Sequence, residues 1–215
     1  MDGTLVDSTA AIEANWRRWA ALHSLDPTPI LAVCHGRKTS ETLREVFPHL
    51  DIRKETVWLD EQEHLMRDGI RPVPGAAELL AQLPPGSWAV VTSASPELAA
   101  LRLRTAGLPL PDVLITGRDV PRGKPYPDGY LLAADRLGVP PAACLVIEDT
   151  PAGLAAGRAA GMQLLGLTTT HPASALLGVP CIKDFRDSRA AQDSFSLAPN
   201  NLPKTRISLF VDSGY

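Results

Sequence analysis

The chain has 215 residues, of which 45% are hydrophobic and 21% are charged, with a formal net charge of −3. This balance is typical of a globular protein with a sizeable core, and it gives no reason to expect nucleic acid or an anionic membrane as a partner. The three cysteines are far apart and form no metal-binding or disulfide pattern, and neither a secretory leader nor a membrane span is evident. We therefore expect a cytoplasmic protein, and nothing in the sequence suggests more than a monomer.

The N-terminal part predicts a short turn followed by a helical region. The opening stretch MDGTLVDS is typical of a strand-to-helix turn that places Asp2 at the carboxyl end of a strand. Residues 8–22, 40–47 and 54–66 predict helices, and Ile12, Trp16 and Trp19 share one helical face. The tryptophans are expected to pack in a core. We expect residues 8–74 to form a small all-helical cap domain.

The remainder of the chain alternates between helical and strand-like segments. Helices are expected at 75–83, 96–107, 127–138 and 150–161, and strands at 88–93, 112–116, 143–149, 163–169 and 181–185. Short apolar strands that alternate with helices predict an α/β fold, a Rossmann-like parallel sheet covered on both faces. This core would comprise residues 1–7 and 75–215. Residues 188–204 predict a loose connection, and residues 205–214 a last strand.

Polar residues gather where the predicted strands end, which is where ligands bind in open parallel sheets. Taken singly, each has an ordinary interpretation: a hydroxyl or acid after a strand often caps a helix, and a loop lysine is usually solvated. Together they could hold Mg²⁺ through carboxylates and surround a phosphoryl group with a hydroxyl, backbone N–H groups and an ammonium. The residues are Asp2, Thr4, Thr92, Ser93, Ser95, Lys124, Glu148 and Asp149.

Four stretches resemble, in order, the four motifs of the haloacid dehalogenase superfamily: MDGTLVDS, VVTSAS, GKPYPDGY and VIEDTPAGLAAGRAAG. The resemblance covers most of the chain, and the helical region after the first motif resembles the small cap of this family. The stretches CHGRKTSETL, WAVVTSAS and EDTPAGLAAGRAAG are most similar to sugar- and polyol-phosphate phosphatases, such as glycerol-phosphate and deoxyglucose-phosphate phosphatases.

The resemblance implies a Mg²⁺-dependent phosphatase that acts through an aspartyl phosphate. Asp2 matches the aspartate that protonates the leaving alcohol and then activates water, and its backbone carbonyl would bind the metal. Glu148 and Asp149 match the metal-binding acids, and Lys124 matches the lysine that balances the phosphate charge. Ser93 matches the phosphate-binding hydroxyl with the Ala94 N–H beside it, and Thr92 is a competing choice.

The chain departs from the family at its first motif, which reads Asp-x-Asp-Gly-Thr in the family. Met1 matches the intervening position, so the attacking aspartate would precede Met1, on a central strand that this chain lacks. We interpret Met1 as an internal methionine of a longer protein and expect the 215-residue chain to be nearly inactive and poorly stable. A rival hypothesis is that ISLFVDSG fills the vacant strand position and offers Asp212; the alternative is an ordinary strand near the sheet edge.

Substrate choice is expected to come from the cap, where Arg37 or Lys38 of the stretch HGRK would reach the substrate; the same residues could be a solvated helix start. Three functions remain open. The first is a small-molecule phosphatase, and the second is a phosphomutase of the same superfamily. The third is a non-catalytic protein that binds sugar phosphates, which the absent nucleophile alone supports. A dehalogenase is disfavoured because carbon–halogen chemistry does not need the acid/base Asp2.

Overall fold

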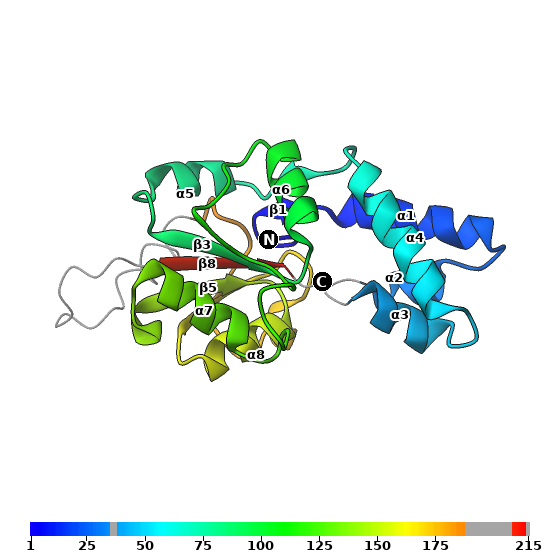
Figure 1. Cartoon of the computed structure of the whole chain (residues 1–215). Coiled ribbons are helices and arrows are strands. Elements are labelled where there is room, and N and C mark those ends of the chain that lie inside the picture. The colour runs from blue at the N-terminus through cyan, green and yellow to red at the C-terminus, as the bar shows by residue number, and fades with distance from the viewer. Residues whose placement is uncertain (35–37, 188–207, 214–215) are drawn as a thin grey trace.

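The computed structural model describes residues 1–34, 38–187 and 208–213. Its centre is a six-stranded sheet in the order β4-β3-β8-β5-β6-β7, and every neighbouring pair is parallel (Figure 1). The prediction of an α/β fold with a parallel sheet is confirmed. The strands are β3 (Trp88–Thr92), β4 (Val113–Ile115), β5 (Cys144–Glu148), β6 (Gln163–Leu167), β7 (Cys181–Ile182) and β8 (Ser208–Ser213).

Helices cover both faces of this sheet, as the apolar strands require, since every residue of β3 and β5 is buried. On one face Leu80 and Leu103 pack into one core cluster, and on the other Tyr130 and Ala156 pack into a second. Figure 1 shows the two helix pairs above and below the strands. The helices are α5 (Ala76–Gln82), α6 (Pro96–Thr105), α7 (Asp128–Leu137) and α8 (Pro151–Ala159), with short 3-10 turns at Pro141–Ala143 and Ala173–Ala175.

The last strand lies in the middle of the sheet. β8 runs parallel to β3 on one side and to β5 on the other, and its register sets Asp212 opposite Val91 and Val211 opposite Ile147. The expectation of a strand near the sheet edge is therefore wrong, and the rival hypothesis gave the right position. The physical reason is that a gap between β3 and β5 would leave their backbone groups without hydrogen bonds, which an apolar segment with β propensity can satisfy.

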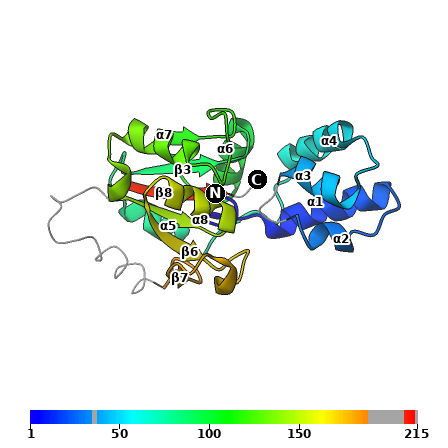
Figure 2. The ribbon, with the colours of Figure 1, turned by 90° about the horizontal axis from the view of Figure 1, so that it is seen from below.

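The N-terminal helices form a separate layer with its own core. They are α1 (Thr9–Leu22), α2 (Thr28–Leu31), α3 (Thr39–Val46) and α4 (Ile52–Leu65), and α2 was not predicted. Trp16 and Trp19 meet edge to face, with ring centroids 5.8 Å apart, inside a cluster that includes Ile12 and Leu59. The predicted packing role of the tryptophans is thus confirmed. Figure 2 shows these helices set to one side of the sheet.

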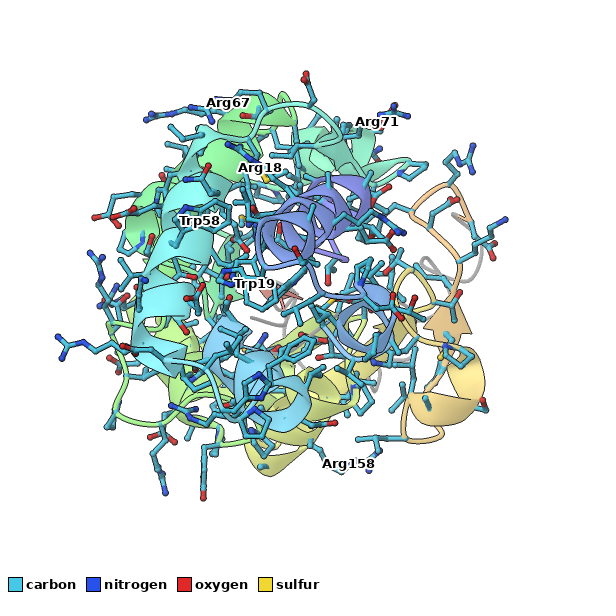
Figure 3. All side chains as sticks on the ribbon, turned by 90° about the vertical axis from the view of Figure 1, so that its right-hand side faces the viewer. Arg18, Trp19, Trp58, Arg67, Arg71 and Arg158 are labelled. Atoms are coloured by element: carbon cyan, nitrogen blue, oxygen red, sulfur yellow. The ribbon has the colours of Figure 1, made fainter. Side chains whose placement is uncertain are left out.

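Two short strands join the helical layer to the sheet region. β1 (Val6–Asp7) pairs antiparallel with β2 (Arg71–Pro72), so the chain leaves and returns through adjacent segments. This pairing agrees with a cap at residues 8–74, whose boundaries stay a prediction. Figure 3 looks onto the helical layer and shows Trp58 and Arg18 near each other, with the Arg18 guanidinium 5.9 Å from the centroid of the Trp58 ring. Within the described residues, no helix is both long and apolar enough to span a membrane.

Candidate active site

The carboxyl end of β5 brings a buried acid and a partly buried lysine together. Lys124 Nζ donates a hydrogen bond to Glu148 Oε1 at 3.1 Å, and Glu148 is completely buried. Burial lowers the pKa of the Lys124 ammonium, whereas the charges of Glu148, Asp149 and Asp2 favour the protonated form. Three of the predicted site carboxylates therefore lie within electrostatic range of one cation.

Asp149 ties the first turn of the chain to the end of β5. Its Oδ1 accepts a hydrogen bond from the Thr4 hydroxyl at 2.7 Å, and its Oδ2 accepts one from the Thr170 hydroxyl. Burial and the neighbouring Glu148 charge raise the pKa of Asp149 to about 7. A bound cation would relieve this repulsion by favouring the ionised carboxylate.

Two glycines permit this close packing. Gly3 has φ = +70°, and a Cβ there would lie 2.0 Å from Asp149 Oδ2. A Cβ on Gly153, in the first turn of α8, would lie 2.1 Å from the carboxyl group of Glu148. The Thr150 side chain caps α8 through the Gly153 N–H and also donates to Glu148 Oε2 at 2.8 Å. The DTPAG stretch thus caps a helix and holds a site carboxylate at the same time.

At the carboxyl end of β3, the hydroxyls of Thr92 and Ser93 lie in different surroundings. Thr92 is buried, and its Oγ1 accepts a hydrogen bond from the Ala94 N–H at 3.1 Å. Ser93 is less buried and lines a cavity of about 230 Å³, together with residues from α3 and α4. Both residues also line a smaller pocket beside Lys124, so only the greater exposure of Ser93 favours it over Thr92. Ser95 caps α6 through the Leu98 N–H, which is an ordinary structural role.

Asp2 lies in a different polar environment from the other two acids. Its Oδ1 accepts a hydrogen bond from the Ser8 hydroxyl at 2.7 Å, and its Oδ2 lies 2.8 Å from Arg102 Nη1. Arg102 in turn contacts Glu63 through Nη2, also at 2.8 Å. All of these side chains are buried. The Asp2 carboxylate thus contacts Ser8 and Arg102 directly, while its charge also acts on Lys124.

The helical layer approaches the site through Lys38. This exposed residue precedes α3 and lines the same cavity as Ser93, and its Nζ lies 3.8 Å from where a Cβ of Gly123 would stand. Gly123 precedes Lys124 in the sequence. Lys38 is thus near the predicted site, while Arg37 lies outside the described residues.

The residues present fit a hard divalent cation. Glu148 and Asp149 are adjacent, buried oxygen donors, which is the ligand type that Mg²⁺ takes, usually with several waters. Among the described residues no group of three or more Asp, Glu, His or Cys side chains could hold a metal. The fit therefore rests on these two carboxylates, and not on a side-chain cage.

Several residues at this site were not predicted. Thr169 donates to the Gly3 carbonyl, Thr170 to Asp149, and a His171 ring nitrogen lies 3.1 Å from the Asp149 carbonyl oxygen. These residues follow β6. The expectation that ligands bind where parallel strands end, which pointed to residues after β3 and β5, would have pointed to them as well. Arg102 and Glu63 lie within helices, and no pattern in the sequence marks their meeting.

Comparison with known proteins settles the family. Residues 1–161 match the family of haloacid dehalogenase-like hydrolases. The chain belongs to this family. Hexitol phosphatase A of Escherichia coli is 43% identical over 172 residues, which cover 78% of this chain and 80% of that protein. The 2-deoxyglucose-6-phosphate phosphatase 1 of Saccharomyces cerevisiae is 36% identical over 198 residues, covering 82% and 80%.

Among solved structures, a haloacid dehalogenase family hydrolase from Deinococcus radiodurans with bound phosphate and sodium has a TM-score of 0.71. It is 31% identical, and the match covers 93% of this chain and 95% of that one. The relatives confirm the predicted resemblance to sugar and polyol phosphatases and the prediction of a phosphoric monoester hydrolase.

Proposed function

We propose that this haloacid dehalogenase-like hydrolase cleaves small sugar or polyol phosphates by a Mg²⁺-dependent route through an aspartyl phosphate. The observation that carries the proposal is the partly buried Lys124–Glu148 pair beside Asp149 and the first turn. It gathers metal-binding oxygens and a phosphate-balancing ammonium at one sheet end. The hexitol and deoxyglucose phosphate phosphatases among the relatives support the substrate class.

Each residue has a defined task in this proposal. Glu148, Asp149 and the Asp2 carbonyl would hold Mg²⁺, which when bound neutralises phosphoryl charge. Lys124 binds a phosphoryl oxygen, while the Ser93 hydroxyl and the Ala94 N–H bind others. Asp2 protonates the departing alcohol and later takes a proton from water. Lys38 and Arg37 of the cap would contact the sugar or polyol part, as cap closure excludes water.

The attacking carboxylate matches the position before Met1. We therefore propose turnover for a form that carries that residue and little turnover for the 215-residue chain, with a cytoplasmic and monomeric state in both. β8 offers a second possibility, because its register puts Asp212 opposite Val91 at the end of β3. If Asp212→Ala left turnover measured in the 215-residue chain intact, Asp212 would not be the nucleophile.

The direct test is phosphate release from hexitol, deoxyglucose and glycerol phosphates, with Mg²⁺ and with EDTA. The assay compares the 215-residue chain with a form extended by the first-motif strand and its aspartate. We expect turnover only in the extended form and only with metal. Lys124→Met should reduce kcat by at least about 100-fold, the scale of losing one oxyanion donor, and Lys183→Met, at an exposed position, should not.

Two other results would replace the proposal. Isomerisation of a sugar phosphate without release of phosphate would indicate a phosphomutase. Tight, Mg²⁺-dependent binding of the same esters by the extended form, without turnover, would indicate a non-catalytic binding protein.

A further inference from the structure

Arg102 is a cation buried between the two parts of the molecule. It lies on α6 of the sheet region with 2% of its surface exposed, and its guanidinium contacts two carboxylates at 2.8 Å each. One is Asp2 of the first turn, and the other is Glu63 in the last turn of α4. The contact therefore connects the helical layer to the residue proposed as acid and base.

One guanidinium contacts two buried carboxylates. A buried carboxylate without a partner is costly, so this shared contact contributes to holding both acids, alongside Lys124, which acts on Asp2, and His64, which acts on Glu63. Burial raises the pKa of Glu63, and the nearby Arg102 opposes that change. The planar fork of arginine can serve two partners at fixed angles, which the point charge of a lysine cannot do as well.

Each contact fixes a different part of the site. The Ser8 hydroxyl donates a hydrogen bond to Asp2 Oδ1, and Arg102 Nη1 makes an ion contact with Oδ2 at 2.8 Å, so each oxygen of the carboxylate has a neighbour. The Glu63 contact holds the second branch of the guanidinium from the helical layer. A movement of α4 relative to α6 would thus change what holds Asp2.

We propose that Arg102 is a positioning residue for Asp2, and that Glu63 makes this positioning depend on where the helical layer sits. The inference rests on the proposed function, in which Asp2 protonates the departing alcohol. It goes further by assigning a role to an ion pair that bridges two parts of the chain. Arg102 acts through Asp2 and needs no contact with substrate.

The experiment compares esters that differ in their need for an acid. An alkyl phosphate such as glycerol 1-phosphate releases an alkoxide that must be protonated, whereas p-nitrophenyl phosphate releases a stable anion. The quantity kcat/KM reports the steps up to departure of the alcohol, so the later activation of water does not enter. In the extended form, Arg102→Met should lower kcat/KM for the alkyl ester at least about 30-fold more than for the nitrophenyl ester, within the range of general acid catalysis.

Companion variants identify the cause of the change. Arg102→Lys keeps the positive charge but loses the planar guanidinium, so its ratio of kcat/KM values for the two esters should lie between those of the parent and of Arg102→Met. Glu63→Gln should shift the ratio of the kcat/KM values for the two esters in the same direction by a smaller factor. It should not change this ratio further when it is added to Arg102→Met. Arg104→Met and Glu61→Gln, at exposed positions on the same two helices, should leave the ratio unchanged.

Hydrogen exchange on the 215-residue chain provides a readout that needs no turnover. Arg102→Met should speed backbone exchange both in residues 1–8 and in the last turn of α4, whereas Arg104→Met should do neither. An equal fall in kcat/KM for both esters, or faster exchange in only one of the two segments, would overturn the proposal. If the extended parent hydrolyses neither ester, the proposed function fails, and the exchange result still decides whether Arg102 links Asp2 to α4.

Discussion

Replacing Gly3 with alanine should test how the first turn meets Asp149, one of the two acids that we propose to bind Mg²⁺. Gly3 has φ = +70°, and the new Cβ would lie 2.0 Å from Asp149 Oδ2 and 2.9 Å from the Thr170 methyl carbon. The left-handed backbone costs about 1–2 kcal/mol for alanine. The overlap adds about 1–3 kcal/mol, because Thr4 and Thr170 hold the buried Asp149 and leave it little room to move.

Gly107→Ala is the matched control, since Gly107 has φ = +71° and a Cβ there would meet nothing within 4 Å. Urea unfolding should show a loss of about 1–2 kcal/mol for Gly107→Ala and a larger loss for Gly3→Ala. Titration with Mg²⁺ should show weaker binding only for Gly3→Ala, because only this variant displaces Asp149. Equal losses of stability together with unchanged Mg²⁺ affinity would refute the reasoning.

Three further predictions concern the sheet and its acids. Phe210→Pro should lower the free energy of unfolding by about 3 kcal/mol more than Phe210→Ala, because proline removes a donor from a strand paired on both sides; equal losses in urea would exclude a central β8. The pKa of Asp149 is raised to about 7. Between about pH 4 and pH 7 the unfolded state is therefore ionised while the folded state is still protonated, and without metal the contribution of Asp149 to the free energy of unfolding falls as the pH rises through this range. In urea unfolding, Asp149→Asn should therefore be more stable than the parent at pH 8, and this advantage should vanish near pH 4. Gly153→Ala, whose Cβ would overlap Glu148, should weaken Mg²⁺ binding measured by calorimetry, and Gly138→Ala, where a Cβ meets nothing within 4 Å, should not.

The sequence predicted the local elements well where each carries its own signal. The helices that begin near Pro96 and Pro151 have a capping hydroxyl and a proline at the first turn, and both are present in the structure. The short α2 was missed because a four-residue helix is too short for a periodic pattern. The position of β8 could not be read from its composition, because an apolar strand fits an edge or a centre and only its neighbours decide.

The candidate site was predictable to the extent that it follows sheet topology. Lys124, Glu148 and Asp149 meet because strand ends and their loops converge at one edge of a parallel sheet. The Arg102 contact follows no such rule. It depends on how α4 approaches α6, which is set by packing between segments distant in the sequence. The sequence around Arg102 does not distinguish it from an exposed arginine on a helix.

The three acids of the site differ in the charged side chains around them, and this difference bears on the roles that we propose for them. Glu148 and Asp149 share the surroundings of Lys124, where added negative charge requires a cation. The charge of Asp2 also acts on Lys124, but the cation in direct contact with its carboxylate is Arg102. In the proposed function two of these acids bind metal and the third exchanges protons, which are tasks that need different surroundings. Since Arg102 also contacts Glu63 of α4, we expect the surroundings of Asp2, more than those of Glu148 and Asp149, to respond when the helical layer moves.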